Sequence, residues 1–197
     1  MITIIDYKAG NLASVKYALE RLGAEYEITS EQEKICQASK IIFPGVGHAR
    51  DAMQNLAQLG LVKILQNISV PFLGICLGMQ IMYEYSAEGD TKCLGLLPGK
   101  IQKFEPTPDM SLKIPHMGWN NISQNKESSL LAGIKEEDYF YFVHSYYAPI
   151  NDVTCAIANY ICDFACAVHY KNFYGVQFHP EKSGEVGERV LKNFLEI

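Results

Sequence analysis

The chain has 197 residues, of which 48% are hydrophobic and 20% charged, and its formal net charge is −5. This length and composition suit one globular domain, so we expect residues 1–197 to fold as a single unit. An acidic chain without a basic cluster argues against a nucleic-acid-binding protein, and its short apolar runs argue against a membrane protein. The N-terminus lacks the positive region of a signal peptide, which favours a cytoplasmic location.

The first half of the chain alternates short apolar strands with amphipathic helices. The pattern predicts strands at 2–6, 25–29, 40–43 and 70–75, and helices that start near residues 12, 49 and 77. The unbroken apolar character of residues 41–43 suits a strand that helices cover on both faces. This alternation predicts an α/β fold with a mostly parallel central sheet, whose ligands bind at the carboxyl ends of the strands.

Strands dominate after about residue 90. The expected strands are 101–104, 118–122, 139–143, 154–159, 165–170 and 173–177, and 184–197 is expected to be a closing helix. Lys171 and Asn172 join the last two strands in a short turn, which predicts a hairpin because Asn tolerates a positive φ. We therefore expect antiparallel strands in the C-terminal half.

Cys76 stands where the apolar strand 70–75 passes into the helix that begins at Leu77. Gly74 lies two residues before Cys76 and Gly78 two residues after it, where a sharp strand-to-helix turn leaves no room for a Cβ atom. A cysteine at the first turn of a helix faces unpaired N–H groups and the positive end of the helix dipole, which favour the thiolate. We therefore predict that Cys76 is a nucleophile rather than an inert core cysteine.

The other five cysteines are scattered along the chain. Cys162 and Cys166 are four residues apart, and no second pair completes the tetrahedral set that a zinc site requires. We expect neither disulfides nor a metal nor a cofactor.

A nucleophilic thiol needs a base, and the segment Phe178-His-Pro-Glu181 offers one. Pro180 keeps His179 out of a helical conformation. Glu181 can then hold one ring nitrogen and leave the other for the thiol. The strand that precedes His179 should end at the same sheet edge as Cys76, so these three residues form the predicted catalytic triad.

Acyl transfer also requires N–H donors for an oxyanion. The N–H of Leu77, directly after the nucleophile, is the natural first donor. The segment Pro44-Gly-Val-Gly47 follows the neighbouring strand, and its glycines allow a second N–H, from Val46 or Gly47, to approach closely. The sequence leaves the choice between these two open, and an ordinary Pro-Gly turn is the alternative.

The motifs 44–47, 74–80 and 178–181 together resemble the class I (triad-type) glutamine amidotransferases. Three further motifs, Asp6–Asn11, Pro115–Asn120 and His144–Tyr146, narrow the resemblance to the glutaminase subunit of imidazole glycerol phosphate synthase, from histidine biosynthesis. The resemblance implies a flavodoxin-like three-layer sandwich. It also implies that Cys76 hydrolyses glutamine to glutamate and ammonia through a thioester.

The resemblance further implies which residues bind glutamine. Gln80, on the helix after the nucleophile, matches the residue that holds the substrate. His144, Ser145 and Tyr146 match a loop that contacts glutamine. An acidic residue beyond the helix usually meets the substrate amino group; Glu88 matches by its offset from Cys76, and Glu84 is the rival.

A glutaminase of this size has no room for the reaction that consumes the ammonia, and ammonium in bulk water is not nucleophilic. A partner must therefore dock over the active site. In the family this partner is a (β/α)8-barrel cyclase subunit, which forms a heterodimer and makes imidazole glycerol phosphate and an aminoimidazole carboxamide ribotide. The family match makes Asn11, Trp119, Tyr141 and Lys182 candidates for the interface.

Several alternatives stay open at this point. A paralogue that feeds ammonia to a surface-sugar enzyme could keep every motif, whereas the glutaminase of pyridoxal phosphate synthase is disfavoured by residues 115–120. A non-catalytic regulatory or binding protein on the same scaffold would be expected to lack Cys76, His179 or Glu181, and all three are present. A cysteine peptidase or γ-glutamyl hydrolase would act on extended substrates without a partner.

Overall fold

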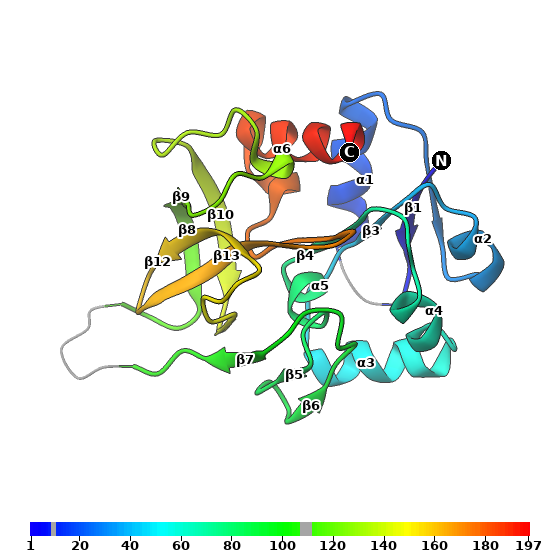
Figure 1. Ribbon diagram of the computed structural model, residues 1–197, viewed down its shortest axis with the longest axis horizontal. Coiled ribbons are helices and arrows are strands. Elements are labelled where there is room, and N and C mark those ends of the chain that lie inside the picture. The colour runs from blue at the N-terminus through cyan, green and yellow to red at the C-terminus, as the bar shows by residue number, and fades with distance from the viewer. Residues whose placement is uncertain (9–10, 107–111) are drawn as a thin grey trace.

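The computed structural model describes residues 1–8, 11–106 and 112–197 (Figure 1). The elements of the first half are β1 (Ile2–Ile5), α1 (Leu12–Arg21), β2 (Tyr26–Thr29), α2 (Gln32–Cys36), β3 (Lys40–Phe43), α3 (Ala49–Gln58), α4 (Val62–Gln66), β4 (Phe72–Ile75) and α5 (Leu77–Gln80). The expected alternation of strands and helices is confirmed, although α2 and α4 were not predicted. Residues 9–10 of the motif 6–11 lie outside the described residues.

The second half is rich in strands, as predicted. Its elements are β5 (Tyr85–Ser86), β6 (Thr91–Lys92), β7 (Lys100–Lys103), β8 (His116–Asn121), β9 (Ser123–Gln124), η1 (Ser129–Leu131), β10 (Tyr139–His144), β11 (Tyr146–Tyr147), β12 (Thr154–Asn159), β13 (Asp163–Tyr170), β14 (Phe173–Val176), η2 (Pro180–Lys182) and α6 (Gly184–Glu196). None of the described helices is long and apolar enough to cross a membrane.

An eight-stranded sheet with the order β2-β1-β3-β4-β14-β13-β12-β9 joins the two halves. The strands from β2 to β14 in this order are parallel, and β13, β12 and β9 extend the sheet in antiparallel fashion. Beside β4, β14 pairs Gly175 with Gly74 and Val176 with Ile75. The carboxyl ends of these two strands therefore meet at one edge of the sheet.

Helices cover both faces of this sheet (Figure 1), with α1 and α6 on one face and α3 and α4 on the other. Ile42 and Leu73 point into the core beneath α1 and α6, whereas Ile41 and Phe72 point into the core beneath α3 and α4. Apolar side chains on both faces explain why these strands are unbroken apolar runs in the sequence. The predicted three-layer α/β sandwich is confirmed.

The hairpin between β13 and β14 is present, but its backbone differs from the prediction. The positive φ, 56°, belongs to Lys171 rather than to Asn172. The Asn172 side-chain amide donates instead to the carbonyls of Ile68 and Val70, at 3.0 and 2.8 Å. Asn172 thus ties the hairpin to the segment that leads into β4.

Two smaller sheets complete the fold. One has the strand order β11-β7-β5-β6. The other pairs β8 with β10, antiparallel, from His116 opposite His144 to Asn121 opposite Tyr139. This second sheet matters for the site, because the backbone of β10 runs alongside the residues that follow β14: the His179 N–H donates to the Tyr141 carbonyl at 2.9 Å.

Candidate active site

Cys76 lies at the turn between β4 and α5 with φ 53° and ψ −110°, a strained conformation for a residue with a side chain. The flanking glycines make this turn possible. A Cβ atom on Gly74 would lie 2.5 Å from Met82 Sδ, and one on Gly78 would lie 2.0 Å from the Phe43 carbonyl oxygen. The predicted strand-to-helix turn and its need for both glycines are confirmed.

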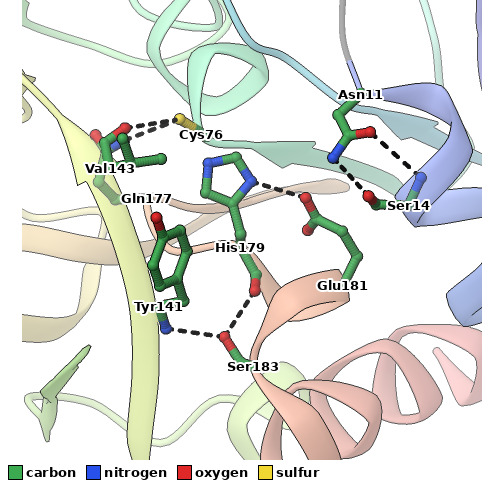
Figure 2. Close-up of polar contacts among 9 residues, drawn as sticks. All are labelled: Asn11, Ser14, Cys76, Tyr141, Val143, Gln177, His179, Glu181 and Ser183. Atoms are coloured by element: carbon green, nitrogen blue, oxygen red, sulfur yellow. Dashed lines mark hydrogen bonds and ion pairs between the residues drawn. The ribbon is translucent and has the colours of Figure 1, made fainter. Parts of the chain in front are cut away.

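His179 reaches the same edge of the sheet, because the Cys76 N–H donates to the carbonyl of Val176 at 2.8 Å and His179 follows three residues later. Its Nδ1 lies 2.7 Å from Glu181 Oε1, and both side chains are buried. Figure 2 shows the other ring nitrogen, Nε2, turned toward the Cys76 sulfur, and this nitrogen makes no hydrogen bond to any described residue. The three residues predicted as a triad are therefore brought together.

The electrostatic environment of His179 keeps a proton on its imidazole ring. Burial lowers the pKa of His179, but the neighbouring Cys76 sulfur and the Glu181 carboxylate outweigh burial and raise it from 6.5 to about 10. The ring is therefore an imidazolium at neutral pH, and its Nδ1–H donates to Glu181. A proton on Nε2 is placed where a leaving amine beside the sulfur could take it.

Ser183 holds the His179 segment against β10 (Figure 2). Its hydroxyl donates to the His179 carbonyl at 2.6 Å and accepts from the Tyr141 N–H at 3.0 Å. Sequence reasoning missed Ser183, because a serine just before a helix usually signals an N-cap, whereas this side chain makes no capping bond to α6.

A pocket of about 280 Å³ opens beside the sulfur. It is lined by Val46, Gly47, Cys76, Leu77, Gln80, Glu88, Val143, His144, Ser145, Tyr146 and His179. All of these except Val143 were predicted site residues, and Glu181 contacts the far side of the His179 ring. A larger hollow of about 470 Å³ lies against α4 and contains none of them. Among the described residues, His, Cys, Asp and Glu form no group of three or more that could hold a metal ion.

The expected oxyanion donors lie in this pocket. Leu77 is the first residue of α5, so its N–H has no preceding helical turn to bind. Val46 and Gly47 both line the pocket as well, and Gly47 has a φ of 107°, which favours glycine. The loop packs tightly on α5, because a Cβ on Gly45 would lie 2.4 Å from the Gly78 nitrogen. Both Val46 and Gly47 stay candidates for the second donor.

The structure separates the two acidic candidates. Glu88 lines the pocket, and its Oε2 accepts the Ala49 N–H at 2.7 Å, at the start of α3. Glu84 instead accepts the Gly99 N–H at 2.9 Å and does not line the pocket. Glu88 is therefore the carboxylate that is placed to meet a ligand beside Cys76.

Gln177 is a site residue that sequence reasoning missed. It is fully buried, its Oε1 accepts from Gln80 Nε2 at 2.8 Å, and its Nε2 lies 3.7 Å from Cys76 Sγ. The signal was present in the sequence, because alternate residues of an extended strand share a face and Gln177 precedes His179 by two.

Two of the candidate interface residues, Trp119 and Tyr141, lie opposite each other on the paired strands β8 and β10, where the structure adds exposed neighbours. Trp119 and Met117 on β8 are 57% and 68% exposed, and Tyr139 on β10 is 54% exposed. The register places these side chains on the face that includes Tyr141 and ends at Val143, in the pocket wall. We call this face, Met117, Trp119, Tyr139, Tyr141 and Val143, the β8–β10 face.

The two remaining interface candidates, Lys182 and Asn11, do not line the pocket. Lys182 is exposed, and its Nζ lies 5.9 Å from the centroid of the Tyr141 ring. Asn11 is half-buried at the start of α1, where it exchanges hydrogen bonds with Ser14 (Figure 2).

The sequence and the fold both match known proteins. The model of the family "Glutamine amidotransferase class-I" matches residues 3–197. The chain belongs to the class-I glutamine amidotransferase family. The predicted family and fold class are thus confirmed.

Curated relatives of this class-I glutamine amidotransferase align over its whole length. Imidazole glycerol phosphate synthase subunit HisH of Bacteroides fragilis strain YCH46 is 49% identical, and the alignment covers 100% of this chain and 99% of that protein. The subunit of the same name from Pasteurella multocida strain Pm70 is 50% identical, with 99% and 97% covered. A crystal structure of a glutamine amidotransferase matches the fold with a TM-score of 0.76 at 16% identity, covering 100% of this chain and 98% of the other.

Proposed function

We propose that this class-I glutamine amidotransferase is the glutaminase subunit of an imidazole glycerol phosphate synthase, in histidine biosynthesis, and that residues 1–197 form one catalytic domain. It hydrolyses glutamine to glutamate and ammonia and passes the ammonia to a partner subunit. The observation that carries the catalytic activity is the convergence of Cys76, His179 and Glu181 at a pocket of about 280 Å³, and the full-length similarity to curated HisH subunits supports the assignment to this synthase. A pocket of this size, near the lower end of the range for small-molecule sites, suits a single amino acid.

The geometry supports a two-step mechanism. The Cys76 thiolate attacks the side-chain amide carbon of glutamine, and the Leu77 N–H with that of Val46 or Gly47 stabilises the oxyanion. The His179 imidazolium gives its Nε2 proton to the departing ammonia, which leaves a glutamyl thioester. Water then attacks the thioester, His179 takes a proton from this water, and the thiolate leaves as glutamate forms.

The residues that line the pocket have different roles in the proposed binding of glutamine. Glu88 carries the negative charge that would pair with the substrate amino group. Both hydrogens of the Gln80 amide are used by protein acceptors, so its Oε1 is the atom left to bind the substrate. The segment His144–Tyr146 also lines the pocket and is proposed to contact the substrate.

The β8–β10 face is the proposed docking surface for a (β/α)8-barrel cyclase. It presents exposed Trp119, Tyr139 and Met117 side chains, which are the residue types enriched at interface centres. It also leads directly to Val143 in the pocket wall, so a partner seated there would cover the site in which ammonia forms. Lys182, whose Nζ lies over the Tyr141 ring, and Asn11 complete the proposed interface.

The nucleophile is tested with Cys76→Ala in the complex with its synthase partner. Glutamate formation from glutamine should be abolished, while the partner's reaction with added ammonium salt should continue. Cys36→Ala, on α2 and outside the pocket, is the matched control and should leave both activities intact. Persistent glutamate formation by the Cys76 variant would refute the assignment.

The partner is tested by co-purification followed by titration of the recovered complex. A barrel-fold cyclase should co-purify, and recovery of a different synthase instead would show a paralogous glutaminase. Trp119→Ala should raise the dissociation constant by at least tenfold, as expected for a central aromatic contact. Tyr170→Ala removes an exposed aromatic ring next to the start of β14, at the end of the strands that is remote from the pocket, and should leave the dissociation constant unchanged.

A further inference from the structure

The backbone carbonyl of Tyr146 orients the polar side chains around the sulfur. It accepts hydrogen bonds from His144 Nδ1 at 2.8 Å and from Gln80 Nε2 at 2.9 Å. Because a carbonyl cannot donate, both of the atoms that face it must carry hydrogens. The tautomer of His144 and the orientation of the Gln80 amide are therefore fixed by chemistry.

The orientation of Gln80 fixes that of Gln177. The same Gln80 nitrogen donates to the side-chain oxygen of Gln177 at 2.8 Å, so the NH₂ end of Gln177 must point away from Gln80. This NH₂ nitrogen lies 3.7 Å from Cys76 Sγ (Figure 2). The Val143 carbonyl, 3.9 Å from the sulfur, can accept only from a protonated thiol, so of these two groups the Gln177 N–H is the one that favours the thiolate.

A buried histidine pair holds the Tyr146 carbonyl in place from the other side. His144 uses its Nδ1–H for this carbonyl, so its Nε2 must accept from His116 Nδ1, 3.0 Å away. Burial lowers the pKa of His116 to about 4 and that of His144 to about 3, so both rings are neutral at neutral pH. His116 also stacks on Tyr160 with ring centroids 4.0 Å apart, which leaves the pair little freedom to turn.

We propose that Gln177 is a further residue of the catalytic site, whose side-chain N–H donates to the Cys76 sulfur and stabilises the thiolate. This inference rests on the proposed function of Cys76 as the nucleophile. A hydrogen bond from an N–H donor strengthens when its acceptor becomes an anion, and it is stronger in a buried site than in water. Gln177 is thereby distinct from Gln80, whose amide hydrogens are bound to protein acceptors.

The test is the pH profile of alkylation of Cys76 by iodoacetamide, followed by peptide-resolved mass spectrometry on the full chain. Gln177→Met removes the donor at similar side-chain length and should move the midpoint to higher pH, slowing alkylation about tenfold below the midpoint. Gln177→Glu keeps the shape, replaces the donor by an anionic oxygen, and should move the midpoint at least as far. Gln102→Met, on β7, should leave the profile unchanged.

A midpoint equal to that of the wild type in either folded Gln177 variant overturns the inference. A second measurement needs no variant at all: in the ¹⁵N-labelled wild-type protein, the Gln177 side-chain NH₂ resonance should shift with the same pH midpoint as alkylation. A resonance that does not follow the thiolate also overturns the inference. If Cys76 of the wild type reacts no faster than exposed Cys36, the proposed nucleophile itself fails, which distinguishes the two failures.

Discussion

Replacing Gly78 by alanine would place a methyl group in the contact between α5 and β3. The added Cβ would lie 2.0 Å from the Phe43 carbonyl oxygen and 3.0 Å from Cδ1 of its ring. Comfortable contacts between such atoms are about 3.5 Å, so the two backbones would have to separate by about 1.5 Å. Phe43 is held in the middle of the large sheet, between β1 and β4, and cannot move freely.

The size of the effect follows from this geometry. Overpacking in a core costs about 1–3 kcal/mol, and we expect about 3 kcal/mol because backbone rather than a side-chain tip must move. With an unfolding entropy of about 2.1 cal/mol/K per residue and 197 residues, this lowers the Tm by about 7 °C. Phe43 leads directly into Pro44–Gly47, so the shift also moves the second oxyanion donor, and losing one donor lowers kcat by about 10²–10³.

Calorimetry and a glutaminase assay of the assembled complex measure the two effects. Gly95→Ala is the control, because Gly95 has a φ of 69° but no atom of the described residues lies within 4 Å of the added Cβ. It should cost about 1 kcal/mol for the positive φ alone, or about 2–3 °C in Tm, with kcat unchanged. If Gly78→Ala is no more harmful than Gly95→Ala, close packing is not what the Cys76 turn requires.

Three further results are expected. Because the pKa of His179 is raised to about 10, the native state keeps a proton that the unfolded state releases near pH 6.5. The free energy of unfolding should therefore fall as the pH rises from about 7 to 10. A free energy that does not change over this range in urea denaturation would contradict the prediction. Glu181→Gln removes the charge 2.7 Å from Nδ1, so it should lower the pKa of His179 in an NMR titration and lower kcat by about 10²–10⁴; an unchanged ring titration would disprove the role of the carboxylate. Asn172→Ala removes two hydrogen bonds and should destabilise the fold by about 1–3 kcal/mol in urea denaturation. The value of kcat should not change, because the hairpin lies at the end of β4 and β14 that is remote from Cys76.

Sequence patterns predicted most of the sheet because its strands are apolar runs bounded by turn residues. Strands β3 and β12 begin and end where the pattern placed them. Helices α2 and α4 were not predicted, because each has only five residues, which are too few to show the helical repeat of apolar residues. The two-residue strands β5, β6, β9 and β11 are likewise too short to show alternation.

The candidate site was predictable where its residues lie in short motifs, as at Cys76 and His179. The sequence could not choose between Glu84 and Glu88, because the choice depends on how the chain folds back after α5. The two-residue spacing to His179 placed Gln177 on the same strand face, but the orientation of its amide could not be predicted, because it depends on the Tyr146 backbone carbonyl. Backbone groups carry no side-chain signature, so their part in the site emerges only from the three-dimensional structure.

The position of β14 has a consequence for biosynthesis of the protein on the ribosome. This strand is translated long after β4, yet it lies inside the large sheet, between β4 and β13. A nascent chain that ends before it has Cys76 but lacks its base, and the layer beneath α6 is still open. Glutamine breakdown therefore cannot begin until β14 and His179 have been translated, so a polypeptide that ends before them releases no ammonia.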